Sequence, residues 1–239
     1  MPNVAIIFAG GTGKRMNTRS KPKQFLELHS KPILVYTLEV FNNHPEIDGI
    51  VLVILEDWIQ YCEELIDKFR LNKVKAIIAG GESAIQSQHN GLKKAAELFG
   101  NDAIVLIHDG VRPLIDEDTI SKNIESVKAH GTGITVTPAI ETITVKTETG
   151  EIGQIIERSK VEMARAPQSF YLSDILEAHR RAEVDEKIFI DSASMMQYYG
   201  HALYTVEGSP ENIKITTPND FYTFRALVDA RENSQIFGI

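Results

Sequence analysis

The chain has 239 residues, of which 43% are apolar and 24% charged, and it contains one cysteine. These proportions are typical of a globular protein and exclude disordered, collagen-like and disulfide-built chains. The net charge of −8 argues against partners such as nucleic acid or an anionic membrane. No apolar run approaches the roughly 20 residues that span a bilayer, and the unpaired Cys62 suits a reducing compartment, so we expect a cytoplasmic protein.

Apolar runs rich in Val and Ile alternate with helical patterns along the sequence. Several runs are apolar at successive positions, as expected of strands that helices cover on both faces. The alternation predicts one domain over residues 1–239, with a three-layer α/β/α fold and a mostly parallel sheet. The predicted strands are residues 4–8, 49–55, 75–79, 103–107, 133–137 and 202–206. The predicted helices are residues 32–42, 57–69, 83–99 and 117–130, with N-caps at Asp57 and Ser83 and helix ends at Gly100 and Gly131.

A glycine-rich loop, AGGTGKRM (residues 9–16), follows the first predicted strand, where parallel sheets bind ligands. Glycines let backbone N–H groups approach a phosphate. Phe8 and Arg15 exclude a Walker A loop, and Met16 excludes a dinucleotide fingerprint. Residues 14–23 contain five basic side chains and no acid. We interpret the loop as a site for a compact polyanion such as a triphosphate, the alternative being a solvated charged loop.

Two further segments carry candidate polar groups. In HDGVRP, which follows the fourth predicted strand, Asp109 could hold Mg²⁺ through its carboxylate, the alternative being a turn or cap. Arg112 could orient Asp109 or contact a second ligand, and His108 is interpreted as structural. Near the end of the chain, Lys214 is predicted to lie in a short strand, where an ordinary surface lysine is the alternative.

Residues 141–158 break the alternation of strands and helices. They are predicted to form two polar, β-branched strands around a turn at residues 148–151. An isolated two-stranded ribbon is marginally stable in water. We therefore expect a protruding β-hairpin that packs on a partner subunit, or else along its own domain.

Six segments, spread over nearly the whole chain, together resemble the cytidylyltransferases that build CDP-linked polyols: AGGTGKRM, PKQFLEL, KPILVYTLEVF, HDGVRP, APQSF and NIKITTPNDF. The resemblance implies a Rossmann-like nucleotidyltransferase fold and a Mg²⁺-dependent transfer of the cytidylyl group of CTP to a polyol phosphate. One branch of the family uses ribitol 5-phosphate for wall and capsule polymers, and the other uses 2-C-methyl-D-erythritol 4-phosphate in isoprenoid synthesis. Gly10, Met163 and Ile190 favour the ribitol branch.

The resemblance also implies roles for individual residues. The catalytic cations would be Arg15, Lys23 and Lys214. The nucleotide would be bound by Ala9, Gly10, Gly11, Gly13, Gly81, Ser87 and Asp109, and Asp109 would also hold Mg²⁺. The acceptor would be contacted by Arg112, Thr142, Arg158 and Asp191. In this reading the 141–158 hairpin is a dimerisation arm that completes the partner subunit's site in a homodimer.

One departure from the family pattern concerns charge. The family usually has Arg where this chain has Ala84, and we hypothesise that Arg165 replaces the missing cation near the nucleotide. Three other functions remain possible at this stage: the methylerythritol phosphate enzyme, a catalytically weak nucleotide-binding regulator, and a sugar-1-phosphate nucleotidylyltransferase that uses UTP or dTTP.

Overall fold

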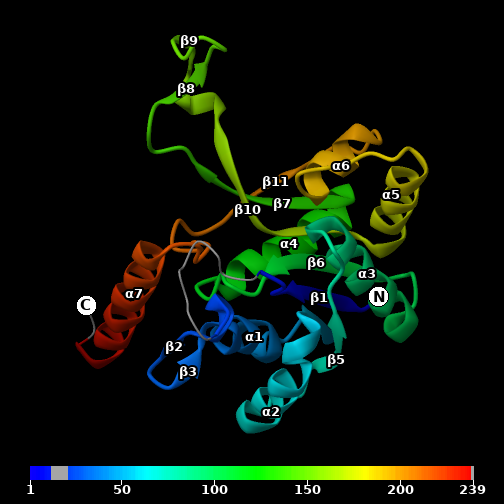
Figure 1. Cartoon of the computed structure of the whole chain (residues 1–239), viewed down its shortest axis with the longest axis vertical. Coiled ribbons are helices and arrows are strands. Elements are labelled where there is room, and N and C mark those ends of the chain that lie inside the picture. The colour runs from blue at the N-terminus through cyan, green and yellow to red at the C-terminus, as the bar shows by residue number, and fades with distance from the viewer. Residues whose placement is uncertain (12–20, 238–239) are drawn as a thin grey trace.

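A computed structural model of the chain describes residues 1–11 and 21–237. Seven strands of this described part form one sheet in the order β11-β7-β10-β6-β1-β4-β5 (Figure 1). β10 is antiparallel to both of its neighbours, and the other pairs are parallel, which confirms the predicted α/β fold with a mostly parallel sheet. The strands are β1 (Asn3–Phe8), β4 (Gly49–Ile54), β5 (Val74–Ala79), β6 (Ile104–Asp109), β7 (Thr132–Pro138), β10 (Glu162–Tyr171) and β11 (Thr205–Glu207).

Helices cover both faces of this sheet (Figure 1). On one face lie α1 (Ile33–Asn43), α2 (Ile59–Phe69) and α4 (Glu117–His130), and on the other lie α3 (Ala84–Phe99), α5 (Leu172–Val184) and α6 (Ser192–Tyr198). Alternate residues of each central strand enter the two cores, because successive side chains of a strand point to opposite faces.

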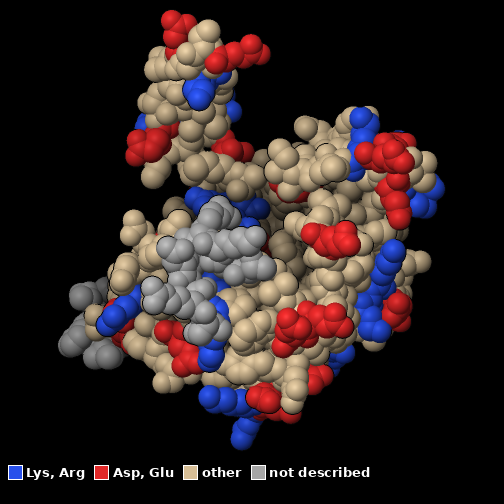
Figure 2. All heavy atoms as spheres, viewed as in Figure 1, with Lys and Arg blue, Asp and Glu red and all other residues tan. Residues whose placement is uncertain are grey.

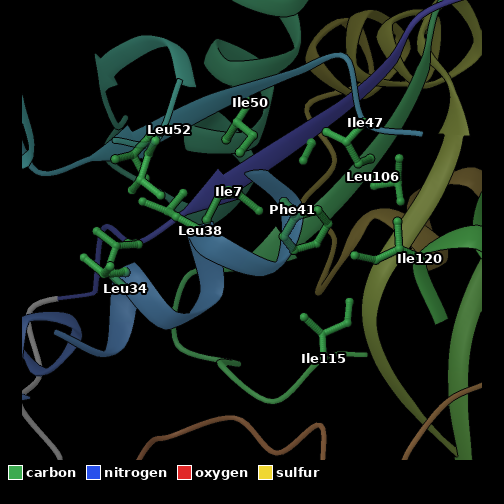
Figure 3. Close-up of a cluster of buried hydrophobic side chains, with 14 of the residues drawn as sticks. Ile7, Leu34, Leu38, Phe41, Ile47, Ile50, Leu52, Leu106, Ile115 and Ile120 are labelled. Atoms are coloured by element: carbon green, nitrogen blue, oxygen red, sulfur yellow. The ribbon is translucent and has the colours of Figure 1, made fainter. Parts of the chain in front are cut away.

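The strand β1 shows this alternation directly. Ala5 and Ile7 belong to the first core, with Phe41 and Leu38 of α1, as Figure 3 shows for the labelled members. Val4 and Ile6 belong to the second core. The strand is therefore apolar at successive positions from residue 4 to residue 8, because both of its faces are buried.

Most predicted helix boundaries agree with the structure. Ser83 caps α3, its hydroxyl accepting a hydrogen bond from the backbone N–H of Gln86 at 3.1 Å. α4 ends at Gly131, whose φ of 85° lies in the left-handed region that glycine adopts without strain. The prediction for Asp57 is wrong: this residue lies in a 3-10 turn, η3 (Glu56–Trp58), and Trp58 takes the N-cap position of α2. The Trp58 ring is stacked on that of Phe25.

Residues 159–200 contain elements that the sequence pattern did not reveal. β10 has no period-two alternation and contains Pro167, which removes a backbone donor from the ladder. The strand accommodates the proline at a bulge, where its register shifts between Ala164 and Gln168. α5 and α6 follow β10 and were likewise not predicted.

The packing of α3 against the sheet is close. A Cβ atom built on Gly91 would lie 2.6 Å from Ile6 Cγ2 and 2.9 Å from Val53 Cγ2, so any larger residue would push the helix outward. Glycine at this position sets the distance between α3 and strands β1 and β4. The same helix carries Ser87 and Gln88 at its N-terminal end.

A separate hairpin of β8 (Ile143–Lys146) and β9 (Ile152–Ile156) projects from the body (Figure 1). Its turn contains Gly150 with φ of 93°, within the predicted turn. The smaller elements are β2 (Glu27–Leu28), β3 (Lys31–Pro32), η2 (Lys23–Phe25), η4 (Arg158–Lys160) and α7 (Pro218–Phe237). Within the described residues, each helix is either too short or too polar to cross a bilayer.

Candidate active site

The candidate site lies where the order of the strands reverses. From β1 the chain continues to β4 and β5 on one side, and then returns to place β6 on the other side of β1. Phe8 pairs with Asp109, so the ends of these two strands are level and the loops that follow them separate from one another. Such a switch point forms a crevice at the carboxyl edge of the sheet, where α/β proteins bind ligands.

A cavity of about 300 Å³ opens beside the first loop, and we call it the glycine-loop cavity. It is bounded by the carboxyl ends of β1, β5 and β6 and by the start of α3. Eight of its lining residues are ones that the sequence predicted: Ala9, Gly10, Gly11, Lys23, Gly81, Ser87, Asp109 and Lys214. Gly13 and Arg15 lie outside the described residues, and their predicted roles stay predictions.

A second cavity of about 200 Å³ adjoins the first, and we call it the arginine cavity. It holds two residues that were predicted to contact the acceptor, Arg112 and Asp191, together with Arg165 and Gln168. In the part of the chain that the structure describes, four residues line both cavities: Phe8, Ala84, Asp109 and Lys214. Two ligands bound in the two cavities would therefore meet at one carboxylate and one ammonium group.

Asp109 joins two cations by short ion pairs. Its Oδ1 accepts a hydrogen bond from Lys214 Nζ at 2.7 Å, and its Oδ2 accepts one from Arg112 Nε at 2.7 Å. Burial alone raises the pKa of this carboxyl, but the Lys214 and Arg112 charges together lower it below its ordinary value. The carboxylate is therefore ionised at neutral pH although it is only 7% exposed.

The sequence placed Asp109 in the loop after the predicted strand. In the structure it is the last residue of β6. The preceding residue, His108, is fully buried, and burial lowers the pKa of its imidazole to about 3. A neutral, buried imidazole agrees with the structural role that the sequence analysis gave it.

Lys214 does not lie in a strand, contrary to the prediction. It belongs to an irregular segment that precedes α7, and this segment is held in place by hydrogen bonds to the backbone of Ile215. Ile215 donates its N–H to the carbonyl of Val111 at 2.9 Å and accepts a hydrogen bond from Lys23 Nζ at 2.9 Å. The sequence could not show this, because the partners come from segments that are far apart in the chain.

Ser87 fixes the glycine turn after β5. Its Oγ accepts a hydrogen bond from Gly81 N–H at 3.0 Å and donates one to the carbonyl of Ser83 at 2.9 Å. Gln24 fixes the first loop in a similar way, through a hydrogen bond of 2.6 Å from its amide to the carbonyl of Ala9. Both walls of the glycine-loop cavity are thus held by side-chain hydrogen bonds.

Asp191 caps α6 and is tied to β10. Its Oδ1 accepts from Ser194 N–H at 2.9 Å, and its Oδ2 accepts from the Gln168 amide at 2.8 Å. Sequence analysis missed Gln168 as a site residue, although it named the APQSF segment that contains it. The missing information was the antiparallel pairing of β10, which brings its first half to the carboxyl edge of β6.

The structure does not bring Thr142 and Arg158 to either cavity of their own chain. Both are exposed at the base of the hairpin, and Arg158 donates a hydrogen bond to the carbonyl of Ile140 at 3.3 Å. Figure 2 shows a group of Lys and Arg side chains at the foot of the hairpin on this face.

Asp109 would hold Mg²⁺ only if a bound substrate supplied further oxygen ligands. Mg²⁺ is usually held by one or two carboxylates, water and substrate phosphates. Asp109 provides one buried carboxylate at the junction of the cavities, and each of its oxygens has a second lone pair. Among the described residues, a group of three potential metal ligands occurs only at His29, Asp229 and Glu232, which line neither cavity.

Comparison with known proteins gives a consistent result. Residues 3–230 match the family model described as 2-C-methyl-D-erythritol 4-phosphate cytidylyltransferase. A ribitol-5-phosphate cytidylyltransferase of Streptococcus agalactiae serotype V is 51% identical, and the match covers 100% of both chains. A 2-C-methyl-D-erythritol 4-phosphate cytidylyltransferase of Clostridium botulinum is 41% identical over 91% of this chain and 93% of its own. The solved structure of a 4-diphosphocytidyl-2C-methyl-D-erythritol synthase from Anaerococcus prevotii superposes with a TM-score of 0.83 and 26% identity, covering 95% of this chain and 96% of its own.

The Asp109 ion pairs predict a large effect of one substitution on stability. Asp109→Ala leaves the buried Arg112 without its carboxylate, so we expect the free energy of unfolding to fall by about 3 kcal/mol in urea denaturation. Because the folded-state pKa of Asp109 is lowered, this difference should be complete above the ordinary carboxyl pKa of 3.8 and should shrink as the pH falls below it.

Glu177→Ala is the matched control. Glu177 pairs with Arg180 at the same i,i+3 spacing and the same 2.7 Å distance, but both side chains are exposed. Its removal should lower the free energy of unfolding far less than Asp109→Ala does, because water screens an exposed pair. Equal losses in the two variants would show that burial does not strengthen the Asp109 pairs.

Proposed function

The chain belongs to the 2-C-methyl-D-erythritol 4-phosphate cytidylyltransferase family, and we propose that it transfers the cytidylyl group of CTP to D-ribitol 5-phosphate. The products are CDP-ribitol and pyrophosphate. One observation carries the proposal: the glycine-loop and arginine cavities meet at Asp109 and Lys214, so two phosphate-bearing ligands can be brought into contact there.

The choice of acceptor is supported by the relatives. The Streptococcus agalactiae protein, named for ribitol 5-phosphate, matches the whole chain at 51% identity. The Clostridium botulinum protein, named for 2-C-methyl-D-erythritol 4-phosphate, matches a smaller part of it at 41% identity. We take ribitol 5-phosphate as the acceptor and the methylerythritol phosphate as the alternative.

In the proposed reaction a phosphate oxygen of the acceptor attacks the α-phosphorus of CTP in line, and the bond to the pyrophosphate oxygen breaks. Both reactants are anions, so their approach and the charge that develops on the transferred group must be compensated by fixed cations. Lys23 and Lys214 line the glycine-loop cavity, and Lys214 is also at the wall that both ligands share. Lys214 would thus contact the α-phosphate, and Lys23 the outer phosphates together with Arg15.

The nucleotide would lie against the other walls of the glycine-loop cavity. The N–H groups of Gly10 and Gly11 would bind the triphosphate, since the absence of side chains lets the backbone approach closely. Gly81 and Ser87 would face the cytosine from the opposite wall. In this arrangement the base lies beside α3 and the phosphates lie beside the first loop.

Magnesium dependence is part of the proposal. Asp109 would hold the ion together with phosphate oxygens of the nucleotide, as the donor set of the cavity junction allows. The ion would supply charge neutralisation at the phosphates. Asp109 would then serve both to position Lys214 and Arg112 and to hold the metal.

The arm would complete the site from a second subunit. Ile152 and Ile155 of the hairpin are 66% and 65% exposed, so the arm presents apolar side chains outside the body. We propose that these residues pack on a second copy of the chain, and that Thr142 and Arg158 thereby reach the acceptor in that copy. The proposal accounts for the distance of both residues from their own cavities.

The substrate assignment predicts a simple assay result. With CTP and Mg²⁺, the purified protein should release pyrophosphate when ribitol 5-phosphate is added, and much less when 2-C-methyl-D-erythritol 4-phosphate is added. UTP, dTTP and ATP should replace CTP poorly, and EDTA should abolish release. Activity only with the methylerythritol phosphate would reverse the acceptor assignment, and no pyrophosphate with either acceptor would contradict the proposed function.

Lys214→Ala should lower kcat by about 10²- to 10³-fold, the scale on which loss of one charge-stabilising donor slows a reaction. The reason is that Lys214 is the cation that the described residues place at the wall common to both cavities. Lys93→Ala removes an exposed lysine of α3 and should leave kcat unchanged. Equal kcat values in wild type and Lys214→Ala would remove Lys214 from the catalytic role.

If the arm completes the site of a second subunit, loss of the dimer should also remove activity. The wild-type protein should elute with about twice the 26.7 kDa of one chain, since the exposed isoleucines of the arm need a covering surface. Replacing Ile152 and Ile155 by Asp should give a monomer with little activity. Val184→Asp, which alters an apolar residue of the body that is 71% exposed, should stay dimeric and active. A fully active monomeric form would contradict the role of the arm.

A further inference from the structure

Arg165 lines the arginine cavity, which also contains Ala84, the position at which the sequence hypothesis found a missing cation. That hypothesis placed Arg165 near the nucleotide, where it would replace a cation missing at Ala84. In the structure Arg165 lines the arginine cavity together with Arg112, and it is absent from the lining of the glycine-loop cavity. Its position therefore points toward the acceptor.

The bulge of β10 explains how Arg165 reaches this cavity. Residues 165–167 lie between two paired stretches of the strand, so their backbone groups need other partners. The carbonyl of Ala166 accepts a hydrogen bond from the Asn212 amide at 2.7 Å, and that of Pro167 accepts one from Thr135 Oγ1 at 2.8 Å. The bulge is thus fixed on both sides, and bulges commonly redirect a side chain next to an active site.

Within the described residues, one nitrogen of the Arg165 guanidinium has a hydrogen-bond partner. Its Nε donates a hydrogen bond to Thr137 Oγ1 at 3.2 Å. Within residues 1–11 and 21–237, no carboxylate pairs with Arg165, and its two terminal nitrogens have no hydrogen-bond partner. By contrast, Arg112 is bound to Asp109 through Nε and to the carbonyl of Asn212 through a terminal nitrogen at 2.9 Å.

The surroundings of Arg165 favour an anion. Among the described residues, three cations line this small cavity: Arg112, Arg165 and Lys214. Burial lowers the pKa of the Arg165 guanidinium, and the nearby charge of Arg112 lowers it further. The two acids of the described chain that also line this cavity already have partners. Asp109 pairs with Lys214 and Arg112, and Asp191 accepts hydrogen bonds from Gln168 and from Ser194. A phosphate monoester supplies the matching charge, and its oxygens suit the paired terminal nitrogens of a guanidinium.

We propose that Arg165 binds the phosphate group of the acceptor and so determines the affinity of the enzyme for that substrate. The inference rests on the proposed function, because it assigns the arginine cavity to the acceptor. Arg165 would hold the phosphate beside Lys214 while the polyol chain extends toward Asp191 and Gln168. In this role Arg165 contributes to binding of the acceptor and not of CTP.

The test separates the two substrates. Arg165→Ala should raise the KM for ribitol 5-phosphate by about 10- to 100-fold, the effect of losing a charged hydrogen bond, and should change the KM for CTP less than threefold. Arg165→Lys, which keeps the charge without the paired donors, should give an intermediate KM. Arg180→Ala removes an exposed arginine and should have no effect on either KM.

Inhibition by substrate fragments identifies the group that Arg165 contacts. Inorganic phosphate should inhibit the wild type in competition with ribitol 5-phosphate and should inhibit Arg165→Ala much less. Inhibition by ribitol, which has no phosphate, should be equal in both. The opposite pattern, with ribitol weakened and phosphate unchanged, would show that Arg165 binds hydroxyl groups and would overturn the proposal.

The outcomes also distinguish this proposal from the proposed function. An inactive wild-type protein would contradict the function itself. An active wild type with an unchanged acceptor KM in Arg165→Ala would overturn only the role of Arg165. A rise confined to the KM for CTP would return Arg165 to the nucleotide. Far-ultraviolet circular dichroism of each variant shows whether the fold is kept, and Arg165→Lys supplies the answer if Arg165→Ala is unfolded.

Discussion

The buried carboxylate of Asp109, placed between the two cations Lys214 and Arg112, is the interaction on which the site depends. Lys214 lies 105 residues away in sequence and reaches Asp109 from an irregular segment. Without a fixed anion, two cations could not be kept at the edge of the sheet in a partly buried place. The carboxylate thereby fixes the wall that separates the two cavities and determines where two ligands can meet.

The distribution of charge follows from the same constraint. The chain carries a net charge of −8, yet cations from separate segments converge on the two cavities: Lys23, Arg112, Arg165 and Lys214. The repulsion between two anionic substrates grows as the distance between them decreases, and it is strong where water is excluded. Cations that are held by hydrogen bonds before the substrates arrive need no reorganisation during the reaction.

The antiparallel strand β10 connects the arm to the site. It begins where the arm ends, and its first half, with the bulge that carries Arg165, lies at the carboxyl edge of the sheet. Its second half pairs with β6 inside the core. A movement of the arm on binding a second subunit would therefore act on the residues next to the arginine cavity, and the dimer proposed here would affect the acceptor more directly than the nucleotide.

The sequence by itself determined the fold class, because apolar runs at successive positions require helices on both faces of a parallel sheet. It also named Gly10, Gly11, Lys23, Asp109 and Lys214 as candidate site residues, since they follow strand ends or belong to segments that resemble one family. All five line the glycine-loop cavity. The tertiary structure decided which residues share a cavity: it placed Arg165 and Gln168 beside Asp191 through a strand interrupted by Pro167, and it separated Thr142 and Arg158 from both cavities. The physical reason is that local sequence encodes burial and periodicity, whereas antiparallel pairing, bulges and ion pairs between distant segments depend on contacts that exist only once the chain has folded.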